Sequence, residues 1–316
     1  LEDGVERRNV FEGNLALMIR SPAAGKALKV HETAAAPQAG ASGFWLTNPD
    51  NTVRGNLGGD AQGNGFWLAF ASKPSGASAA VAMRPDRLPL GVFDDNIAHS
   101  NAQPGINLDW VVTNDAGRVA PNTYTPSADG SVNDSQRIRM AMRRNTSYKN
   151  NGGGLWNRVA LPDYTEWVSA DNAGVHFAGA GDDGRIVRGL VIGQSLNHNS
   201  STYPPNTEPP SAFATYHSTY AMRDNTVVGF AFVEGKMSGV LRTNDYYITA
   251  VDKGTVRNPN NRLIASHPGF RTLPPSLDGQ PLANRHWTFA GALWDPHGYW
   301  GPKNNFWVYD QPFLTA

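Results

Sequence analysis

The chain has 316 residues, with 27 lysine and arginine residues balanced by 27 aspartate and glutamate residues. This balance argues against a general electrostatic hold on nucleic acid or on an anionic membrane, and no apolar run approaches the ~18 residues that a membrane-spanning helix needs. The absence of cysteine excludes disulfides and thiolate metal sites.

Pairs of asparagines five residues apart recur along the first half of the chain. The pairs are Asn9–Asn14, Asn51–Asn56, Asn96–Asn101 and Asn145–Asn150, and a weaker copy begins at Asn225. The tetrapeptide Gly-Phe-Trp-Leu at 43–46 returns 22 residues later at 65–68. Three strands of ~3 to 6 residues and their corners need about this length. We therefore predict a parallel β-helix whose coils stack into one core.

The repeated asparagines suit the corners of such coils. An asparagine side chain tolerates the left-handed backbone conformation, and identical residues in successive coils form hydrogen-bonded ladders. The asparagine pairs follow one another at 42, 45 and 49 residues. Because these steps exceed one coil, a second degenerate coil or a long loop lies between copies, and we expect the long loops on one side.

The expected elements follow in chain order. We expect strands within 5–19, a loop rich in Ala, Gly and Pro at 21–41, a coil at 44–70, a loop at 73–88, a coil at 90–109, a polar excursion at 114–134, strands from 138 to 192, a proline-rich loop at 203–210 and further strands at 226–233, 239–242 and 246–251. Residues 1–285 are predicted to form the β-helix with its loop insertions. Residues 286–316 hold four of the nine tryptophans and are predicted to form an aromatic-rich carboxy-terminal cap.

Several charged residues are candidates for chemistry on a glycan. A glycoside hydrolase of the ordinary kind needs two carboxylates ~5 Å or ~6.5 to 9.5 Å apart, and a histidine titrates near neutral pH. The candidates are Glu2, Asp3, Asp94, Asp95, Asp109, Asp182, Asp183 and His99, with Arg7, Arg8, Arg137, Arg139, Arg143 and Arg144 as cations for an acidic polymer and Trp67 as a sugar-binding ring. The alternative is that the carboxylates cap turn amides and that His99 lies on the coil surface.

The sequence contains no recognisable metal-binding motif. The eight histidines are scattered, and no His-Glu-x-x-His or Asp-x-Asp-x-Asp-Gly pattern occurs. No cofactor is predicted with certainty. Ca²⁺ stays compatible with the sequence, because its oxygen ligands can come from carboxylates of neighbouring coils.

Three segments resemble consecutive parts of the cell-migration-inducing, hyaluronan-binding protein (CEMIP) family and its transmembrane hyaluronidase relative. The segments are Leu1-Glu2-Asp3-Gly4-Val5-Glu6 with Asn9, Phe44-Trp45-Leu46-Thr47-Asn48-Pro49-Asp50-Asn51, and Pro89-Leu90-Gly91-Val92-Phe93 with Asn96 and His99-Ser100-Asn101. The resemblance extends more weakly through Asn145 to Trp156 and to Gly229-Phe230-Ala231-Phe232. It implies a right-handed parallel β-helix from a secreted or cell-surface protein that handles hyaluronan or a similar acidic glycan. Glu2 and Asp3 belong to the matched segment and are expected nearest the chemistry, with Arg7, Arg8 and His99 lining a groove.

Two differences from the family accompany this resemblance. The family has further coils and a β-rich domain before the segment that corresponds to Leu1–Gly4, so we expect a missing amino-terminal segment or another chain packed on the first coil. The family's cysteines are absent, which points to a bacterial relative. The preferred hypothesis is part of an extracellular enzyme that hydrolyses an acidic polysaccharide; the alternatives are a non-catalytic surface or assembly β-helix that binds a protein or cell-wall partner, and a polysaccharide lyase.

Overall fold

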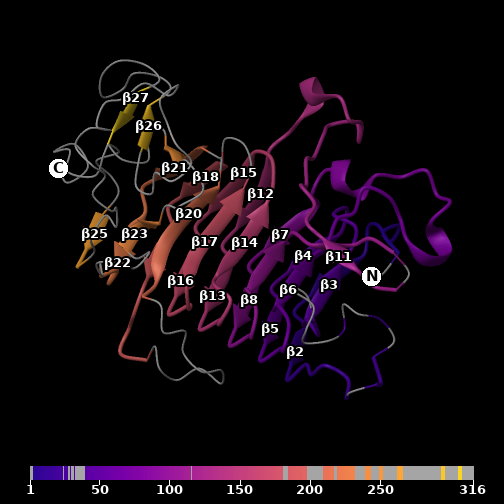
Figure 1. The fold of residues 1–316 in the computed structure, drawn as a ribbon, viewed down its shortest axis with the longest axis horizontal. Coiled ribbons are helices and arrows are strands. Elements are labelled where there is room, and N and C mark those ends of the chain that lie inside the picture. Colours follow the sequence, from indigo (N-terminus) through magenta and orange to yellow (C-terminus); the bar gives the residue numbers. More distant parts are fainter. Residues whose placement is uncertain are drawn as a thin grey trace.

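The computed structural model describes residues 3–23, 25–27, 29, 32, 40–114, 116–180, 184–197, 209–216, 219–231, 239–242, 249–251, 262–265, 293–295 and 305–307. Their strands stack into three long sheets that form a parallel β-helix (Figure 1), as the repeat predicted. No helix among these residues has the length and apolar character needed to span a membrane.

Along the first seven coils, each coil contributes one strand to each of the three sheets. Sheet A contains β1 (Val10–Glu12), β4 (Thr52–Arg54), β7 (Val92–Asp94), β12 (Met140–Arg143), β15 (Pro162–Thr165), β18 (Gly184–Val187), β21 (Thr219–Arg223), β24 (Thr249–Val251), β26 (Leu293–Asp295) and β27 (Asn305–Trp307). Sheet B contains β2 (Leu15–Leu17), β5 (Leu57–Gly59), β8 (Ile97–His99), β13 (Thr146–Tyr148), β16 (Val168–Ala170), β19 (Leu190–Ile192), β22 (Thr226–Val228) and β25 (Arg262–Ile264). Sheet C contains β3 (Phe44–Leu46), β6 (Phe66–Leu68), β9 (Ile106–Leu108), β14 (Leu155–Arg158), β17 (Val175–Ala180), β20 (Ser211–Tyr216) and β23 (Gly239–Arg242).

The core is built by side chains that repeat at the same register from coil to coil. In sheet C, Phe44 pairs with Phe66, and their rings stack 4.7 Å apart. Phe66 pairs in turn with Ile106, which is fully buried. Sheets A and B add buried residues such as Phe93 and Val191 to the same hydrophobic cluster. A coil cannot bury these side chains alone, so stacking on its neighbours creates the core.

The asparagines form ladders along the coil corners, as expected. Asn96 donates from its backbone N–H and its Nδ2 to Oδ1 of Asn145, at 3.0 and 3.2 Å. Its own Oδ1 accepts the equivalent two hydrogen bonds from Asn56, at 3.0 and 3.1 Å. Nδ2 of Asn96 also donates to the carbonyl of Val53 at 2.9 Å. Every polar atom of this buried side chain is therefore paired.

The alignment of the asparagine pairs differs from the one that their spacing suggested. Asn9–Asn14 and Asn51–Asn56 bracket strands of sheet A, whereas Asn96–Asn101 and Asn145–Asn150 bracket strands of sheet B. The ladder step runs from Asn56 to Asn96, 40 residues apart in sequence. The 45-residue step from Asn51 to Asn96 therefore joins two different corners, and the expected alignment of these two asparagines is wrong.

The glycine before each Phe-Trp-Leu step is required by close packing between coils. A Cβ atom on Gly65 would lie 2.7 Å from the carbonyl oxygen of Gly105 and 2.8 Å from Nδ2 of Asn101. Gly43, one coil earlier, meets the carbonyl oxygen of Gly65 at 2.8 Å in the same way. Any side chain here would push neighbouring coils apart, because these distances are shorter than van der Waals contact.

The three corners of the coil differ in how much chain they hold. Seven successive connections from sheet A to sheet B have two residues each, from Gly13–Asn14 to Asp224–Asn225, and the first residue of each is left-handed. Residues 69–91 and 109–139 are long excursions from sheet C to sheet A, and residues 193–210 connect sheet B to sheet C. The expectation that the long loops share one side is therefore wrong, because two of the three corners carry them (Figure 1).

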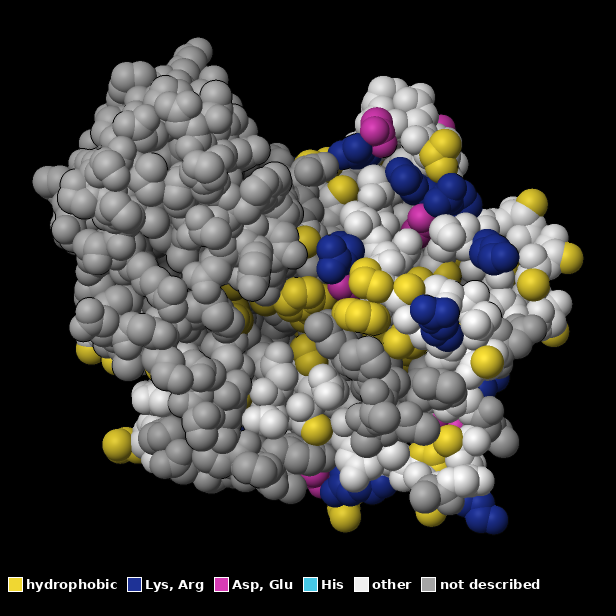
Figure 2. Space-filling model, viewed as in Figure 1, with side chains coloured by type: hydrophobic (Ala, Val, Ile, Leu, Met, Phe, Trp, Pro, Cys, Tyr) yellow, Lys and Arg dark blue, Asp and Glu magenta, His cyan; other side chains and the backbone are white. Residues whose placement is uncertain are grey.

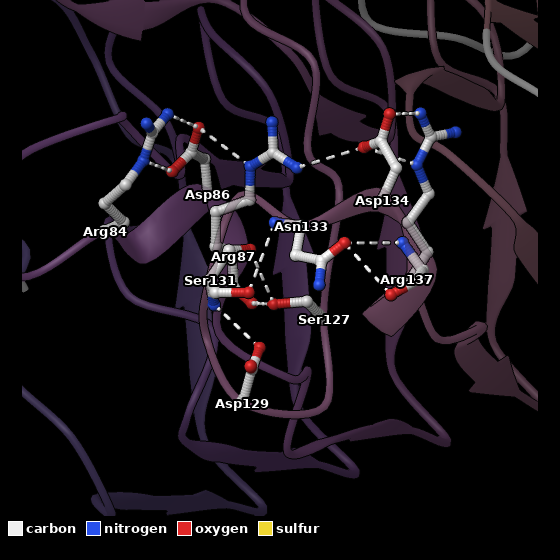
Figure 3. A network of polar contacts seen from close by, with 10 residues as sticks. Arg84, Asp86, Arg87, Ser127, Asp129, Ser131, Asn133, Asp134 and Arg137 are labelled. Carbon is white, nitrogen blue, oxygen red and sulfur yellow. Dashed lines mark hydrogen bonds and ion pairs between the residues drawn. The ribbon is translucent and has the colours of Figure 1, made fainter.

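The excursions 69–91 and 109–139 are joined to each other by polar contacts (Figure 3). Thr125 and Ser127 donate backbone N–H groups to the carbonyls of Asp86 and Arg87, at 3.0 and 2.9 Å. Arg87 lies between the carboxylates of Asp86 and Asp134, at 3.9 and 4.0 Å. Backbone pairing and a row of alternating charges thus hold two loops from successive coils in one position.

The carboxy-terminal part is described only in short pieces. β26 pairs with β24 in parallel and with β27 antiparallel, at the end of sheet A. Most of residues 286–316, including Trp287 and Trp300, lie outside the described residues. The division at residue 285 and the aromatic cap stay predictions.

Candidate functional site

The outer face of sheet C carries a cluster of aromatic and charged side chains. Trp45, Trp67, Asn107 and Trp156 share one register column. Asp109 follows β9 directly and lies beside Arg158, one coil further on, because Leu108 pairs with Asn157. Since alternate residues of a strand point to the same face, Trp156 and Arg158 project from the same side of β14.

Asp109 is the centre of this cluster, and its side chain is fully buried. Its Oδ1 accepts hydrogen bonds from the backbone N–H groups of Trp110 and Asn122, at 2.7 and 3.0 Å. Its Oδ2 accepts hydrogen bonds from Nε1 of Trp156 and Nε of Arg158, at 2.9 and 3.1 Å. These four donors occupy the acceptor positions of the carboxylate. Asp109, predicted to contact substrate, is thus bonded to protein groups on both oxygens.

The guanidinium group of Arg158 is bound to Asp109 through Nε, and its two terminal nitrogens are available to a ligand. Its side chain is 32% exposed, and Nε is bound to Asp109. Among the described residues, no hydrogen bond is recorded for its terminal Nη1 and Nη2 atoms. A guanidinium group fixed in this way offers a planar pair of donors that matches a carboxylate. The half-buried ring of Trp156 stands next to it, and a tryptophan ring provides a flat apolar surface of the kind that packs against a sugar.

A hairpin of β10 (Val111–Val112) and β11 (Val119–Ala120) covers the neighbouring part of the sheet. Trp67 is 1% exposed beneath it and donates its Nε1–H to the carbonyls of Asp109 and Trp110, at 3.0 and 2.8 Å. Trp67 packs with Val111 and stacks on Trp45 with ring centroids 5.3 Å apart. The predicted sugar-binding ring is therefore covered by the hairpin, and Trp156 is the more accessible ring over Asp109.

The surface in Figure 2 brings both kinds of side chain together. Hydrophobic side chains form a band across the middle of the described part, and Lys and Arg side chains stand around this band. This mixture of apolar surface and separate cations suits a ligand that is partly apolar and partly anionic.

The residues predicted near the amino terminus have structural partners. Glu2 lies outside the described residues. Asp3 accepts the backbone N–H of Ser75 on its carbonyl at 2.9 Å and the hydroxyl of Ser78 on Oδ2 at 3.1 Å. Asp3 therefore fastens the excursion 69–91 to the first coil.

The two predicted cations of the first coil lie beside one carboxylate. Arg7 forms an ion pair with Asp50 at 2.7 Å. Arg8 is 81% exposed and lies 3.9 Å from the same carboxylate. Their role in lining a groove stays a prediction.

Asp94 and Asp95 lie at the corner between sheets A and B. Asp95 forms two hydrogen bonds with Arg144, at 2.7 and 2.9 Å, and this guanidinium lowers the pKa of the Asp95 carboxyl group. Asp94 accepts the backbone N–H of Arg143 at 3.0 Å. Both carboxylates therefore link neighbouring coils, and their contact with a substrate stays a prediction.

His99 lies on the outer face of sheet B. Its ring stacks on Tyr148 with centroids 4.9 Å apart, and burial lowers the pKa of the imidazole. Asp95 thus follows a strand of sheet A, His99 lies in sheet B and Asp109 follows a strand of sheet C, and the structure does not bring them together. An acid–base role for His99 stays a prediction, and Asp182 and Asp183 lie outside the described residues.

Trp156 and Arg158 are the residues of this cluster that were not predicted. The alternation Trp156-Asn157-Arg158 after Gly154 is a signal for two outward side chains on one strand. Their partner Asp109 is 49 residues from Arg158, so the sequence spacing hid the contact.

The Ca²⁺ hypothesis has no candidate ligand set in the described part of the chain. No group of three or more histidine, aspartate or glutamate side chains comes together there in a way that could hold a metal ion. Asp109 cannot start such a group, because protein donors already occupy both of its oxygens.

Comparisons with known proteins agree with this fold. Residues 1–106 match the family model described as CEMIP beta-helix. The chain is 28% identical to human cell surface hyaluronidase CEMIP2 over 63% of its length, and 26% identical to the mouse cell migration-inducing and hyaluronan-binding protein over 98% of its length. A similar relative is the zebrafish cell surface hyaluronidase, 28% identical over 64% of this chain.

The chain spans only 17%, 27% and 16% of the lengths of these three relatives. The similarity therefore concerns one part of each relative. Within that limit, the family model, the relatives and the stacked coils agree: the chain is similar to proteins of the CEMIP family, and residues 1–106 match the model of the CEMIP beta-helix.

Proposed function

We propose that this β-helix binds an acidic polysaccharide outside the cell, and that the outer face of sheet C is its binding surface. The observation that carries the proposal is the open guanidinium of Arg158 beside the ring of Trp156. A sugar acid presents an apolar ring face and a carboxylate, and this pair offers a partner for each.

The names of the relatives support the same substrate class. They include hyaluronidases and a hyaluronan-binding protein, and hyaluronan carries a carboxylate on alternate sugars. Their cell-surface names also support an extracellular location for this chain.

Binding is favoured over cleavage as the activity of the described surface. Hydrolysis in the ordinary way needs two carboxylates facing each other across a sugar bond. The predicted carboxylates Asp3, Asp95 and Asp109 instead hold a loop, a corner and a hairpin. Glycoside hydrolysis and lyase chemistry are kept as outcomes of the test.

The test measures binding of hyaluronan, chondroitin and alginate fragments, with a neutral polysaccharide as a reference. We expect the acidic polymers to bind and the affinity to fall as salt is added. Arg158→Gln should weaken binding at least about tenfold, because a charge-assisted hydrogen-bonding pair is lost. Arg188→Gln is the matched control, since Arg188 is an exposed cation on the distant sheet A corner, paired with Glu166 at 3.1 Å.

The same samples are analysed for polymer length and for ultraviolet-absorbing ends. Shortening without absorbance would add hydrolysis to the function, and absorbance would add lyase chemistry. The proposal fails if no acidic polymer binds, or if Arg158→Gln binds as well as the unaltered chain.

A further inference from the structure

Four hydrogen-bond donors from three segments of the chain meet at the carboxylate of Asp109. Trp110 and Asn122 are the two ends of the hairpin β10–β11, and Trp156 and Arg158 belong to the next coil. The two hairpin ends share Oδ1, and the two side chains on β14 share Oδ2. One buried group thus connects the hairpin with the pair that faces solvent.

We propose that Asp109 is a positioning residue that gives the site its preference for a carboxylate-bearing sugar and links that sugar to the hairpin. The inference rests on the proposed function. Asp109 does not touch the ligand. It acts through Arg158, whose plane it fixes, and through Trp156, whose ring it orients by the indole N–H.

The fixed guanidinium carries the argument for selectivity. A free arginine has many rotamers and loses them when it binds, which reduces affinity. Arg158 has already lost much of that freedom, because Nε is bonded to a buried oxygen at 3.1 Å. Nη1 and Nη2 are thereby offered together, as a pair of donors that a planar carboxylate can accept. A neutral sugar can accept hydrogen bonds from these atoms only through single hydroxyl oxygens, without the charge and the planar match of a carboxylate.

The hairpin is fastened at both ends near the same point. Asn122 donates its Nδ2 to the carbonyl of Phe70 at 2.8 Å, and Trp67 donates its Nε1 to Trp110 at 2.8 Å. A ligand that binds Arg158 stabilises the Arg158–Asp109 contact, and the same carboxylate accepts the N–H groups of Trp110 and Asn122. Binding should therefore protect the hairpin from local opening.

Asp109→Asn tests the inference with little change of shape. The amide keeps one oxygen, which can accept the hairpin N–H groups, but its Nδ2 cannot accept hydrogen bonds from Trp156 and Arg158. We expect about a tenfold loss of affinity for a carboxylated oligosaccharide and a smaller loss for the carboxyl-reduced, neutral form of the same oligosaccharide, which depends on the Trp156 ring but not on the ionic contact with Arg158. Hydrogen exchange at 110–122 should no longer slow when the carboxylated ligand is added.

Asn122→Ala is the matched control. It removes the Nδ2 bond to Phe70 and leaves the Asp109–Arg158 contact in place, so exchange in the hairpin should quicken while the preference for the carboxylated ligand persists. Arg158→Lys is the second variant, used also if Asp109→Asn does not fold. It keeps the charge but lacks the planar fork, and we expect a loss of the carboxylate preference.

The outcomes separate the two proposals. If the unaltered chain binds no acidic oligosaccharide, the proposed function fails and the inference fails with it. If the unaltered chain binds but Asp109→Asn weakens the carboxylated and neutral ligands equally, or weakens neither, Asp109 has only a structural role and the inference alone is overturned. Unchanged selectivity in Arg158→Lys would overturn it as well.

Discussion

The asparagine ladders and the Asp109 cluster both bury polar side chains, but they differ in repetition. Asn96 is fully buried, and so is the side chain of Asp109, and each has a partner for every polar atom. The ladder contact returns in coil after coil, whereas the contacts of Asp109 occur once. In a solenoid, a polar contact that repeats from coil to coil holds the coils together. A polar contact that occurs once can instead position a particular loop or side chain, as Asp109 positions the hairpin and Arg158.

The largest effect is expected at the centre of a ladder. Asn96→Ala removes the oxygen that accepts both hydrogen bonds from Asn56 and the Nδ2 that donates to the Val53 carbonyl and to Asn145. Asn145 keeps the backbone N–H of residue 96, but the Asn56 donors and the Val53 carbonyl lose these bonds inside the core. Each such group costs about 1–3 kcal/mol, so the free energy of unfolding should fall by about 4 kcal/mol. Asn14→Ala, at the exposed end of the same ladder, should cost about 1 kcal/mol. Chemical denaturation measures both, and equal losses would contradict the ladder as a continuous stack.

His176 is another buried polar side chain, and it tests whether such a residue affects stability alone or also ligand binding. Of the two histidines in the described part of the chain, it is the fully buried one. Its Nδ1 lies 2.9 Å from the hydroxyl of Ser169, and its Nε2 has no hydrogen-bond partner among the described residues. Burial lowers its pKa from 6.5 to about 4. The unfolded chain therefore takes up a proton between these values when the folded chain does not, and stability is lost as the pH falls from 6.5 to 4.

The expected loss is about 3 kcal/mol at pH 4 relative to pH 7. Denaturation curves at a series of pH values should show this loss, and His176→Leu should show a flatter dependence. Glycan binding at pH 7 should be the same in both, because His176 lies inside the coil. A change in binding, or an unaltered pH profile, would show that this histidine does more than fill the core or that it is not buried in solution.

The smallest effect on stability is expected at an exposed ion pair between equivalent corner residues of neighbouring coils. Glu166 and Arg188 occupy the same left-handed corner position in successive coils and pair at 3.1 Å, with side chains 43% and 55% exposed. Exposed ion pairs contribute little, so Glu166→Gln should lower stability by less than about 0.5 kcal/mol. A loss as large as that of Asn96→Ala in the same denaturation assay would mean that repetition, and not burial, gives a corner its strength.

The fold could be predicted because its coil constraints are local. The 22-residue return of Gly-Phe-Trp-Leu corresponds to Phe44 stacking on Phe66, and the glycine before it is required by the next coil's carbonyl. The ladder alignment could not be predicted in the same way. Two different corners use a left-handed residue followed by asparagine, as at Asp95–Asn96 and Ser100–Asn101. A pair five residues apart therefore has the same spacing around a strand of either sheet.

The candidate site was only partly predictable. Asp109 and Trp67 were identified, and they lie in the cluster, but as its buried support. Arg158 was missed because its contact with Asp109 depends on how residues 109–139 leave the coil and return to it. The length of this loop does not show which residues of the next coil pair with β9. The carboxylates at Asp3, Asp94 and Asp95 had the right chemistry for a site and lie on other parts of the solenoid.

The unequal corners have a consequence for how such a protein can diversify. The two-residue turns from sheet A to sheet B leave no room for insertion, from Gly13–Asn14 to Asp224–Asn225. Both corners that border sheet C accept extra chain. Mutation can therefore lengthen, shorten or exchange the segments around sheet C while the other corner keeps every coil in register. The loops around the outer face of sheet C can therefore change during evolution while the coils stay the same, as antibody loops vary on a constant framework.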